Sequence, residues 1–125
     1  MYEVGTSRSV RALHVMPEMP PPENELHAHD YRLDVVVRRE VLDERGMVCD
    51  LDVLEAALAE AANELEGQDL EMIRPPDADA VTVEVFAKWL HSTLADVISN
   101  DGGEVLSVRV WESPVAFGGY TAALT

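Results

Sequence analysis

The stretch Leu26-His27-Ala28-His29-Asp30-Tyr31 places two histidines one residue apart, at the start of a run in which apolar and polar residues alternate. Such alternation is typical of a β-strand, in which every second side chain points to the same face. His14 ends an earlier run of the same kind. Three imidazoles with an open fourth position are the ligand set of a catalytic zinc site. The sequence therefore predicts that His14, His27 and His29 bind Zn²⁺.

Two predicted strands and a stiff loop surround these histidines. Residues 3–15 and 26–41 both alternate, and in each the apolar face carries the histidines at one end. Four prolines within residues 17–22 exclude both a helix and a central strand between them. Because the apolar faces must turn toward the core, we expect the histidines where the core meets solvent.

Two helices and a hairpin should follow. Asp50 or Asp52 is a suitable cap for the first helix, which should end near Gly67, and Thr82 is a suitable cap for the second. Residues 69–80 have no clear pattern, and residues 104–112 and 117–124 form the predicted hairpin. The expected buried positions, at helical spacing, are Leu51, Leu54, Leu58, Ala61 and Leu65, then Phe86, Leu90, Thr93 or Leu94, and Val97.

The order of these elements predicts an α+β fold. Short connections favour antiparallel neighbours, so the four strands should form one antiparallel sheet with both helices on one face. The outer strands of such a sheet have free edges, which favour pairing between subunits. We therefore expect a closed homo-oligomer. The fourth histidine, His91, falls on the second helix and is expected at the surface or in packing.

Composition limits the partners of this chain. Its net charge of −15, from 9 basic and 24 acidic residues, repels nucleic acid and anionic membranes alike. No apolar run is long enough to cross a bilayer, and the first residues lack the layout of a secretory signal. The single Cys49 excludes an intrachain disulfide and fits a reducing compartment. We expect a cytoplasmic protein of one domain, residues 1–125, that binds neither nucleic acid nor membrane.

Glu112 is the second candidate site residue. It follows Leu106, Val108 and Val110 on one face of a predicted strand. A carboxylate on a buried face is costly unless it meets donors, and a heterocycle with a ring N–H beside an amino group satisfies both of its oxygens. A glutamate at a strand end can equally face water, so both interpretations stay open.

Several segments, taken in chain order over nearly the whole sequence, carry a family resemblance. They are Val10-Arg11-Ala12-Leu13-His14, the stretch 26–31, Gly46-Met47-Val48-Cys49-Asp50-Leu51, Thr82 with Glu84, and Val108-Arg109-Val110-Trp111-Glu112-Ser113. These segments resemble those of the 6-pyruvoyltetrahydropterin synthase and 6-carboxytetrahydropterin synthase family. The first is similar to that family's first strand, which ends in a zinc histidine. The others resemble, in the same order, its motifs LHGHNY, GMVIDF, PTAEN and VRVWET. Ala28 stands where glycine is usual.

The resemblance implies the tunnelling fold, with trimers of subunits stacked into hexamers. It also implies zinc on His14, His27 and His29, and a pterin anchored by Glu112 at a subunit interface. These implications agree with the ligand set and the buried-face carboxylate described above.

Two departures from the family pattern bear on catalysis. The loop before the histidine pair lacks the family's catalytic cysteine; Glu23 stands at the spacing seen in the carboxytetrahydropterin enzymes, and Glu25 lies close by. Cys49 falls on a different segment and is expected to be a small buried hydrophobe. In the family's Asp-His stretch, Glu66 and Gly67 take the places of the aspartate and the histidine.

Two functions follow as hypotheses. The first is a zinc-dependent pterin-modifying lyase with altered chemistry, which acts on a dihydroneopterin-type substrate and uses Glu23 or Glu25 as the base. A carboxylate is a weaker base than a thiolate, which favours retro-aldol cleavage over triphosphate elimination. The alternative is a non-catalytic zinc protein that binds a pterin or purine-like ligand and has lost the proton relay. In that case both loop glutamates are solvated.

Overall fold

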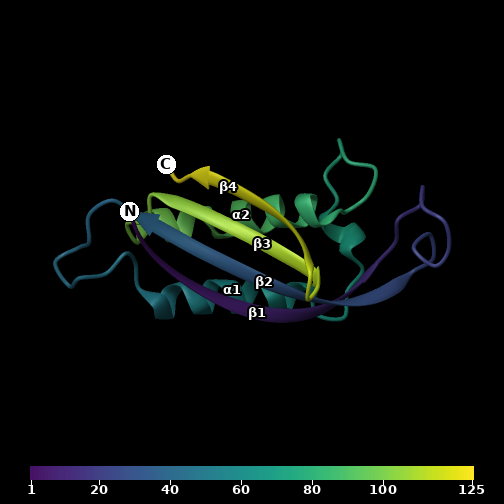
Figure 1. Cartoon of the computed structure of the whole chain (residues 1–125), viewed down its shortest axis with the longest axis horizontal. Helices are drawn as coiled ribbons and strands as arrows, with labels where there is room; N and C mark the ends of the chain where they lie inside the picture. The colour runs from purple at the N-terminus through teal and green to yellow at the C-terminus, as the bar shows by residue number, and fades with distance from the viewer.

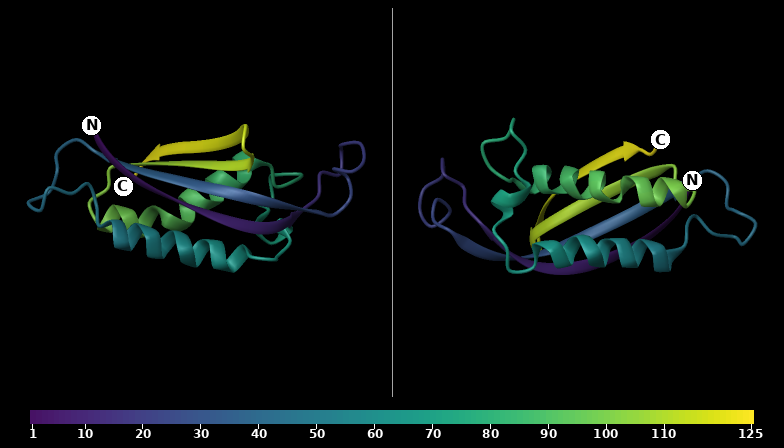
Figure 2. Two further views of the ribbon diagram at one scale, coloured as in Figure 1. Left: turned by 60° about the horizontal axis from the view of Figure 1, so that its bottom comes forward. Right: turned by 180° about the vertical axis from the view of Figure 1, so that it is seen from behind.

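A four-stranded antiparallel sheet carries two helices on one of its faces, as the sequence predicts. The computed structural model describes residues 1–125, and its strands lie in the order β1-β2-β3-β4. Figure 1 shows this sheet, and the right-hand view of Figure 2 shows both helices across the same face. The elements are β1 (Tyr2–His14), β2 (His27–Arg39), α1 (Leu51–Leu65), the 3-10 helix η1 (Leu70–Ile73), α2 (Val83–Asn100), β3 (Val105–Ser113) and β4 (Ala116–Ala123).

The register of β1 and β2 fixes the positions of the three histidines. His14 lies opposite His27, and Ala12 lies opposite His29, so all three imidazoles share the helix-covered face of the sheet. The next residues on that face, Val10 and Tyr31, are buried and also lie opposite each other. The histidines therefore lie at the end of the core, as expected from the alternation.

The helices begin at the predicted caps. Asp50 Oδ1 accepts from the Asp52 N–H at 2.9 Å, and Thr82 Oγ1 accepts from the Val85 N–H at 3.1 Å. After α1 the chain turns at Gly67, whose φ of 72° suits glycine.

Figure 1 places the loop between β1 and β2 at the same end of the molecule as the loop that precedes α2.

Most of the predicted helix positions are buried, with two exceptions. Leu51 and Val97 are 37% and 42% exposed, and the prediction was wrong for both. Leu51 is the first residue of α1, and the buried residues of that helix begin only at Leu54. In α2 the buried row advances by four residues, through Phe86, Leu90, Leu94 and Ile98, so Ile98 is buried in place of Val97.

The segment between the helices is more regular than predicted. Residues 69–80 include η1, whose N-terminus is capped by Asp69 through a hydrogen bond of 2.9 Å to the Glu71 N–H. Just before η1, the chain runs along the outer edge of β1. The Leu13 N–H donates to the Gln68 carbonyl at 2.8 Å, and Leu13 and Asp69 form a parallel bridge. These bonds hold the end of β1 that carries His14.

The face of the sheet without helices is polar. At its centre the Asp34 carboxylate accepts hydrogen bonds from Ser7 at 2.6 Å, Arg32 at 2.8 Å and the Trp111 indole at 2.8 Å. Burial raises the pKa of Asp34, but these three donors outweigh burial and hold the pKa below its ordinary value.

Neither α1 nor α2 has the length and apolar composition that a membrane-spanning helix needs.

Candidate metal centre and adjoining cavity

The three predicted ligands form one cluster. One ring nitrogen from each of His14, His27 and His29 lies within 4.8 Å of the other two. The Nε2 atoms of His27 and His29 are 3.0 Å apart. Two nitrogens bound to one tetrahedral Zn²⁺ at about 2.0–2.1 Å would lie about 3.3 Å apart, so this pair needs little movement to bind one ion.

The orientation of His27 is set by the loop before it. Its Nδ1 lies 2.7 Å from the Glu25 carbonyl oxygen. A carbonyl only accepts, so Nδ1 carries the proton and Nε2 presents its lone pair to the cluster. A backbone acceptor behind a histidine is the usual support for a metal ligand.

His14 has the most unusual surroundings of the three. It is 7% exposed, and neither of its ring nitrogens has a hydrogen-bond partner. Burial lowers the pKa of His14, and the neighbouring His27 and His29 lower it further. The Val81 backbone offsets part of this shift, although its geometry falls short of a hydrogen bond. A buried imidazole without a partner is costly. A bound cation would satisfy it, so the residues fit a metal ion.

A cavity of about 470 Å³ opens beside the cluster. The loop between β1 and β2 contributes Met16, Met19 and Glu23, and the start of α2 contributes Thr82 and Glu84. Glu112 completes the lining from the end of β3, together with Val83 and the three histidines. The cavity thus combines three imidazoles with three carboxylates.

Glu112 lines this cavity from the end of β3. Its side chain is exposed, and it also lines a second cavity of about 550 Å³ that includes Arg11, Arg32 and Trp111. His29 belongs to both cavities as well. Burial raises the pKa of the Tyr31 phenol, and the charge of Glu112 raises it further. The charge of Glu112 therefore reaches Tyr31, the buried ring that packs against His29.

The two candidate loop glutamates differ in position. Glu23 lines the cavity, whereas Glu25 does not, and the contact of Glu25 with the cluster is made by its backbone carbonyl. Backbone bonds shape this loop: the Met16 N–H donates to the Glu23 carbonyl at 2.7 Å, and the Glu23 N–H to the Pro20 carbonyl at 3.1 Å. The structure places Glu23 in the lining of the histidine cavity and Glu25 outside that lining.

Glu84 is a cavity residue that we did not identify as a site residue from the sequence. It lies in the first turn of α2, next to β4. At Gly118 of β4, an added Cβ would lie 2.5 Å from the Val83 Cγ2 and 3.1 Å from the Glu84 nitrogen. Only glycine lets α2 approach this closely. The signal in the sequence was an acid just after a capping threonine, which by itself indicates only a helix start.

The remaining candidates lie elsewhere. Glu66 accepts from the Arg11 backbone N–H at 2.9 Å, and the Gly67 N–H donates to the Arg11 carbonyl at 2.7 Å, so this segment holds the edge of β1. Cys49 is buried, as expected, and burial raises the pKa of its thiol to about 11. His91 is also buried; its ring packs against Tyr120 with centroids 5.0 Å apart, which confirms the packing role.

Comparison with known proteins connects this arrangement to one family. A family model described as 6-pyruvoyl tetrahydropterin synthase matches residues 3–123. The 6-pyruvoyl tetrahydropterin synthase of Plasmodium falciparum is 16% identical, covers 98% of each chain and has a TM-score of 0.79. The Caenorhabditis elegans enzyme is 23% identical, with 98% of this chain and 97% of that chain covered and a TM-score of 0.69.

A third structure is a variant of the Plasmodium vivax enzyme in which a catalytic glutamate is replaced by cysteine. It is 15% identical to this chain, covers 98% of both chains and has a TM-score of 0.80. At these identities the structural likeness establishes the fold. No curated protein has a matching sequence.

Proposed function

Because the chain belongs to the 6-pyruvoyl tetrahydropterin synthase family, we propose that it is a zinc-dependent lyase that acts on a dihydroneopterin-type pterin. The observation that carries this proposal is His14, a buried imidazole with no partner for either nitrogen, held beside His27 and His29. A neutral imidazole triad with an open side is the ligand set of a catalytic zinc.

His14, His27 and His29 would hold the ion. When bound, zinc acidifies the oxygens of the substrate side chain and stabilises negative charge that develops on them. His27 supplies its Nε2 because the Glu25 carbonyl occupies its Nδ1–H. Burial lowers the pKa of His14, which favours the neutral ring that a metal ligand must present.

Glu112 would orient the pterin. Its carboxylate lies at the junction of two cavities, both of which also include His29. Two oxygens on one carboxylate can accept from the ring N–H and the amino group of a pterin at the same time. This bidentate contact would direct the side chain of the substrate toward the histidine cluster.

Glu23 is the proposed base. It is the one loop glutamate that lines the cavity, and a Plasmodium vivax relative has a glutamate as a catalytic residue. Glu23 would accept the proton of a side-chain hydroxyl while the adjacent carbon–carbon bond breaks. The same carboxyl would then return that proton to the carbon that has taken the electron pair, so that the retro-aldol cleavage is balanced.

We also propose that subunits assemble into trimers that stack into hexamers. The support is that β1 and β4 are the outer strands of the sheet, and that exposed strand edges favour pairing. Native mass spectrometry at low micromolar concentration tests this: we expect a hexamer, and a monomer under all conditions would contradict it.

Incubation of the zinc-loaded protein with 7,8-dihydroneopterin triphosphate, with products separated by chromatography, tests the activity. We expect a pterin product whose side chain is shortened to its first carbon, and one zinc per chain by elemental analysis. Micromolar binding without turnover would favour the alternative, a zinc-containing pterin or purine-like binder. Zinc stoichiometry near zero together with no binding would exclude both.

A further inference from the structure

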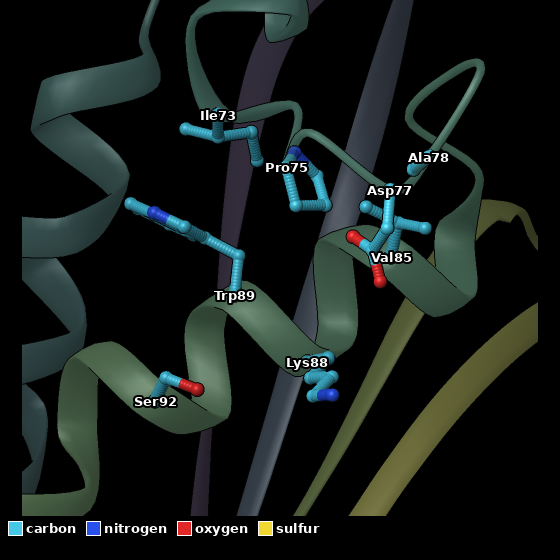
Figure 3. A pocket seen from close by; sticks show the side chains of 8 residues that line it. All are labelled: Ile73, Pro75, Asp77, Ala78, Val85, Lys88, Trp89 and Ser92. Atoms are coloured by element: carbon cyan, nitrogen blue, oxygen red, sulfur yellow. The ribbon is translucent and has the colours of Figure 1, made fainter.

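A separate cavity lies between α2 and the loop that precedes it. It encloses about 390 Å³, and its walls include Ile73, Pro75, Val85 and Trp89. Figure 3 shows Trp89, Ile73 and Pro75 around one space, and Asp77 and Val85 also line it. No residue of this lining belongs to the histidine cavity. Its volume is in the range of small-molecule sites.

The loop that forms one wall is held in place by hydrogen bonds. The Ala78 N–H donates to the Pro75 carbonyl at 3.1 Å, and Arg74 Nη1 donates to the Ala78 carbonyl at 2.8 Å. Arg74 also pairs with Glu71 of η1. A wall that is already ordered loses little conformational freedom when a ligand binds.

The opposite wall is aromatic and firmly packed. Trp89 is half-buried, and its ring meets Phe86 edge to face with centroids 6.3 Å apart. Phe86 is fully buried and packs in turn on Tyr31. A fixed indole opposite aliphatic side chains is a surface on which a flat ring packs well.

The charge at this cavity favours an amino group over an anion. Asp77 is exposed and takes part in none of the ion pairs of the chain. The one cation of the lining, Lys88, has its Nζ 5.8 Å from the centre of the Tyr120 ring on β4. A free carboxylate accepts from amino and ring N–H groups, and the net charge of −15 repels anions.

We propose that this pocket is a second binding site, for a flat heteroaromatic molecule of one or two rings that carries an amino group. The ring packs between Trp89 and the Ile73–Pro75 wall, and the amino group donates to the Asp77 carboxylate. The site requires neither zinc nor any residue of the histidine cavity, so it stands or falls separately from the proposed lyase activity.

Titration of the ¹⁵N-labelled full chain with 2-aminoquinoline tests the site. The chain has two tryptophans, and each gives one indole N–H signal. We expect the Trp89 signal to move and saturate. Trp111, whose indole N–H donates to Asp34 at 2.8 Å, lines the Glu112 cavity, so its signal reports separately on binding at the proposed pterin site. Quinoline lacks the amino group and should bind about tenfold more weakly, and quinoline-2-carboxylate should not bind.

Three variants make the assignment specific. Asp77→Ala should weaken 2-aminoquinoline binding about tenfold, whereas Asp79→Ala, which removes another exposed acid of the same loop, should leave it unchanged. Glu112→Gln should also leave the Trp89 shift unchanged, which separates this pocket from the proposed pterin site. An unmoved Trp89 signal, an equal affinity in Asp77→Ala, or equal binding of the carboxylate would overturn the proposal.

Discussion

Replacing Glu23 by glutamine should remove the proposed base and keep the shape of the loop. Glu23 is exposed and lines the histidine cavity, and its backbone carbonyl, which accepts from the Met16 N–H at 2.7 Å, is unchanged in the variant. General base catalysis contributes about 10²–10⁴ in rate. This corresponds to about 2.7–5.5 kcal/mol of transition-state stabilisation. We therefore expect kcat to fall by about 10²–10⁴.

Glu25→Gln is the matched control, because it makes the same chemical change two residues away. Glu25 contacts the cluster through its backbone carbonyl oxygen, 2.7 Å from His27 Nδ1. The glutamine variant keeps this backbone carbonyl. Its kcat should remain within about twofold of the wild type, since no reacting group is lost. The assay is the rate of product formation from 7,8-dihydroneopterin triphosphate, measured at equal zinc content. An equal loss in both variants, or a Glu23→Gln rate close to wild type, would refute the assignment.

Three further outcomes follow from the same contacts. Zinc at about 1,000 times its Kd should stabilise the fold by about 4 kcal/mol and raise Tm by about 10–20 °C. The His14→Ala variant should lose this shift in Tm. An equal shift in the variant would place the ion elsewhere. Gly118→Ala should destabilise the protein by about 1–3 kcal/mol in urea unfolding, because its Cβ would meet the first turn of α2; unchanged stability would show that the turn yields. Asp34 has a folded pKa below its ordinary value of 3.8, so its contribution is present above that pH and is lost as the pH falls through the folded pKa. The stability difference between wild type and Asp34→Asn should shrink over that acidic range, and a constant difference would contradict this.

The parts of the site that lie on strands were predictable from the sequence. The alternation in β1 and β2 determines which residues share a face, and the register then places His14 opposite His27. Glu112 follows Val110 at the end of β3, but the register shifts between Trp111 and Ser113, so alternation alone does not determine its direction. Period-two patterning needs no knowledge of the neighbouring elements, which is why it predicts the positions of the histidines.

The parts that lie on loops and at helix ends were less predictable. The sequence could not distinguish Glu23 from Glu25. Turns within the proline-rich loop decide which of the two side chains lines the cavity, and the loop has no repeating pattern from which these turns could be predicted. The position of Glu84 in the cavity depends on the close approach of α2 to Gly118, and such a tertiary contact cannot be read from local sequence. Val97 was misplaced because three- and four-residue helical spacings both fit the sequence, and packing against the sheet selected the latter.

X-ray absorption at the zinc K edge, on protein loaded with one zinc per chain, tests the central claim most directly. We predict three nitrogen ligands and one oxygen ligand at about 2.0–2.1 Å, and loss of bound zinc in the His14→Ala variant. A sulfur shell at about 2.3 Å, or the same spectrum with His14 replaced, would contradict the three-histidine site and the zinc chemistry built on it.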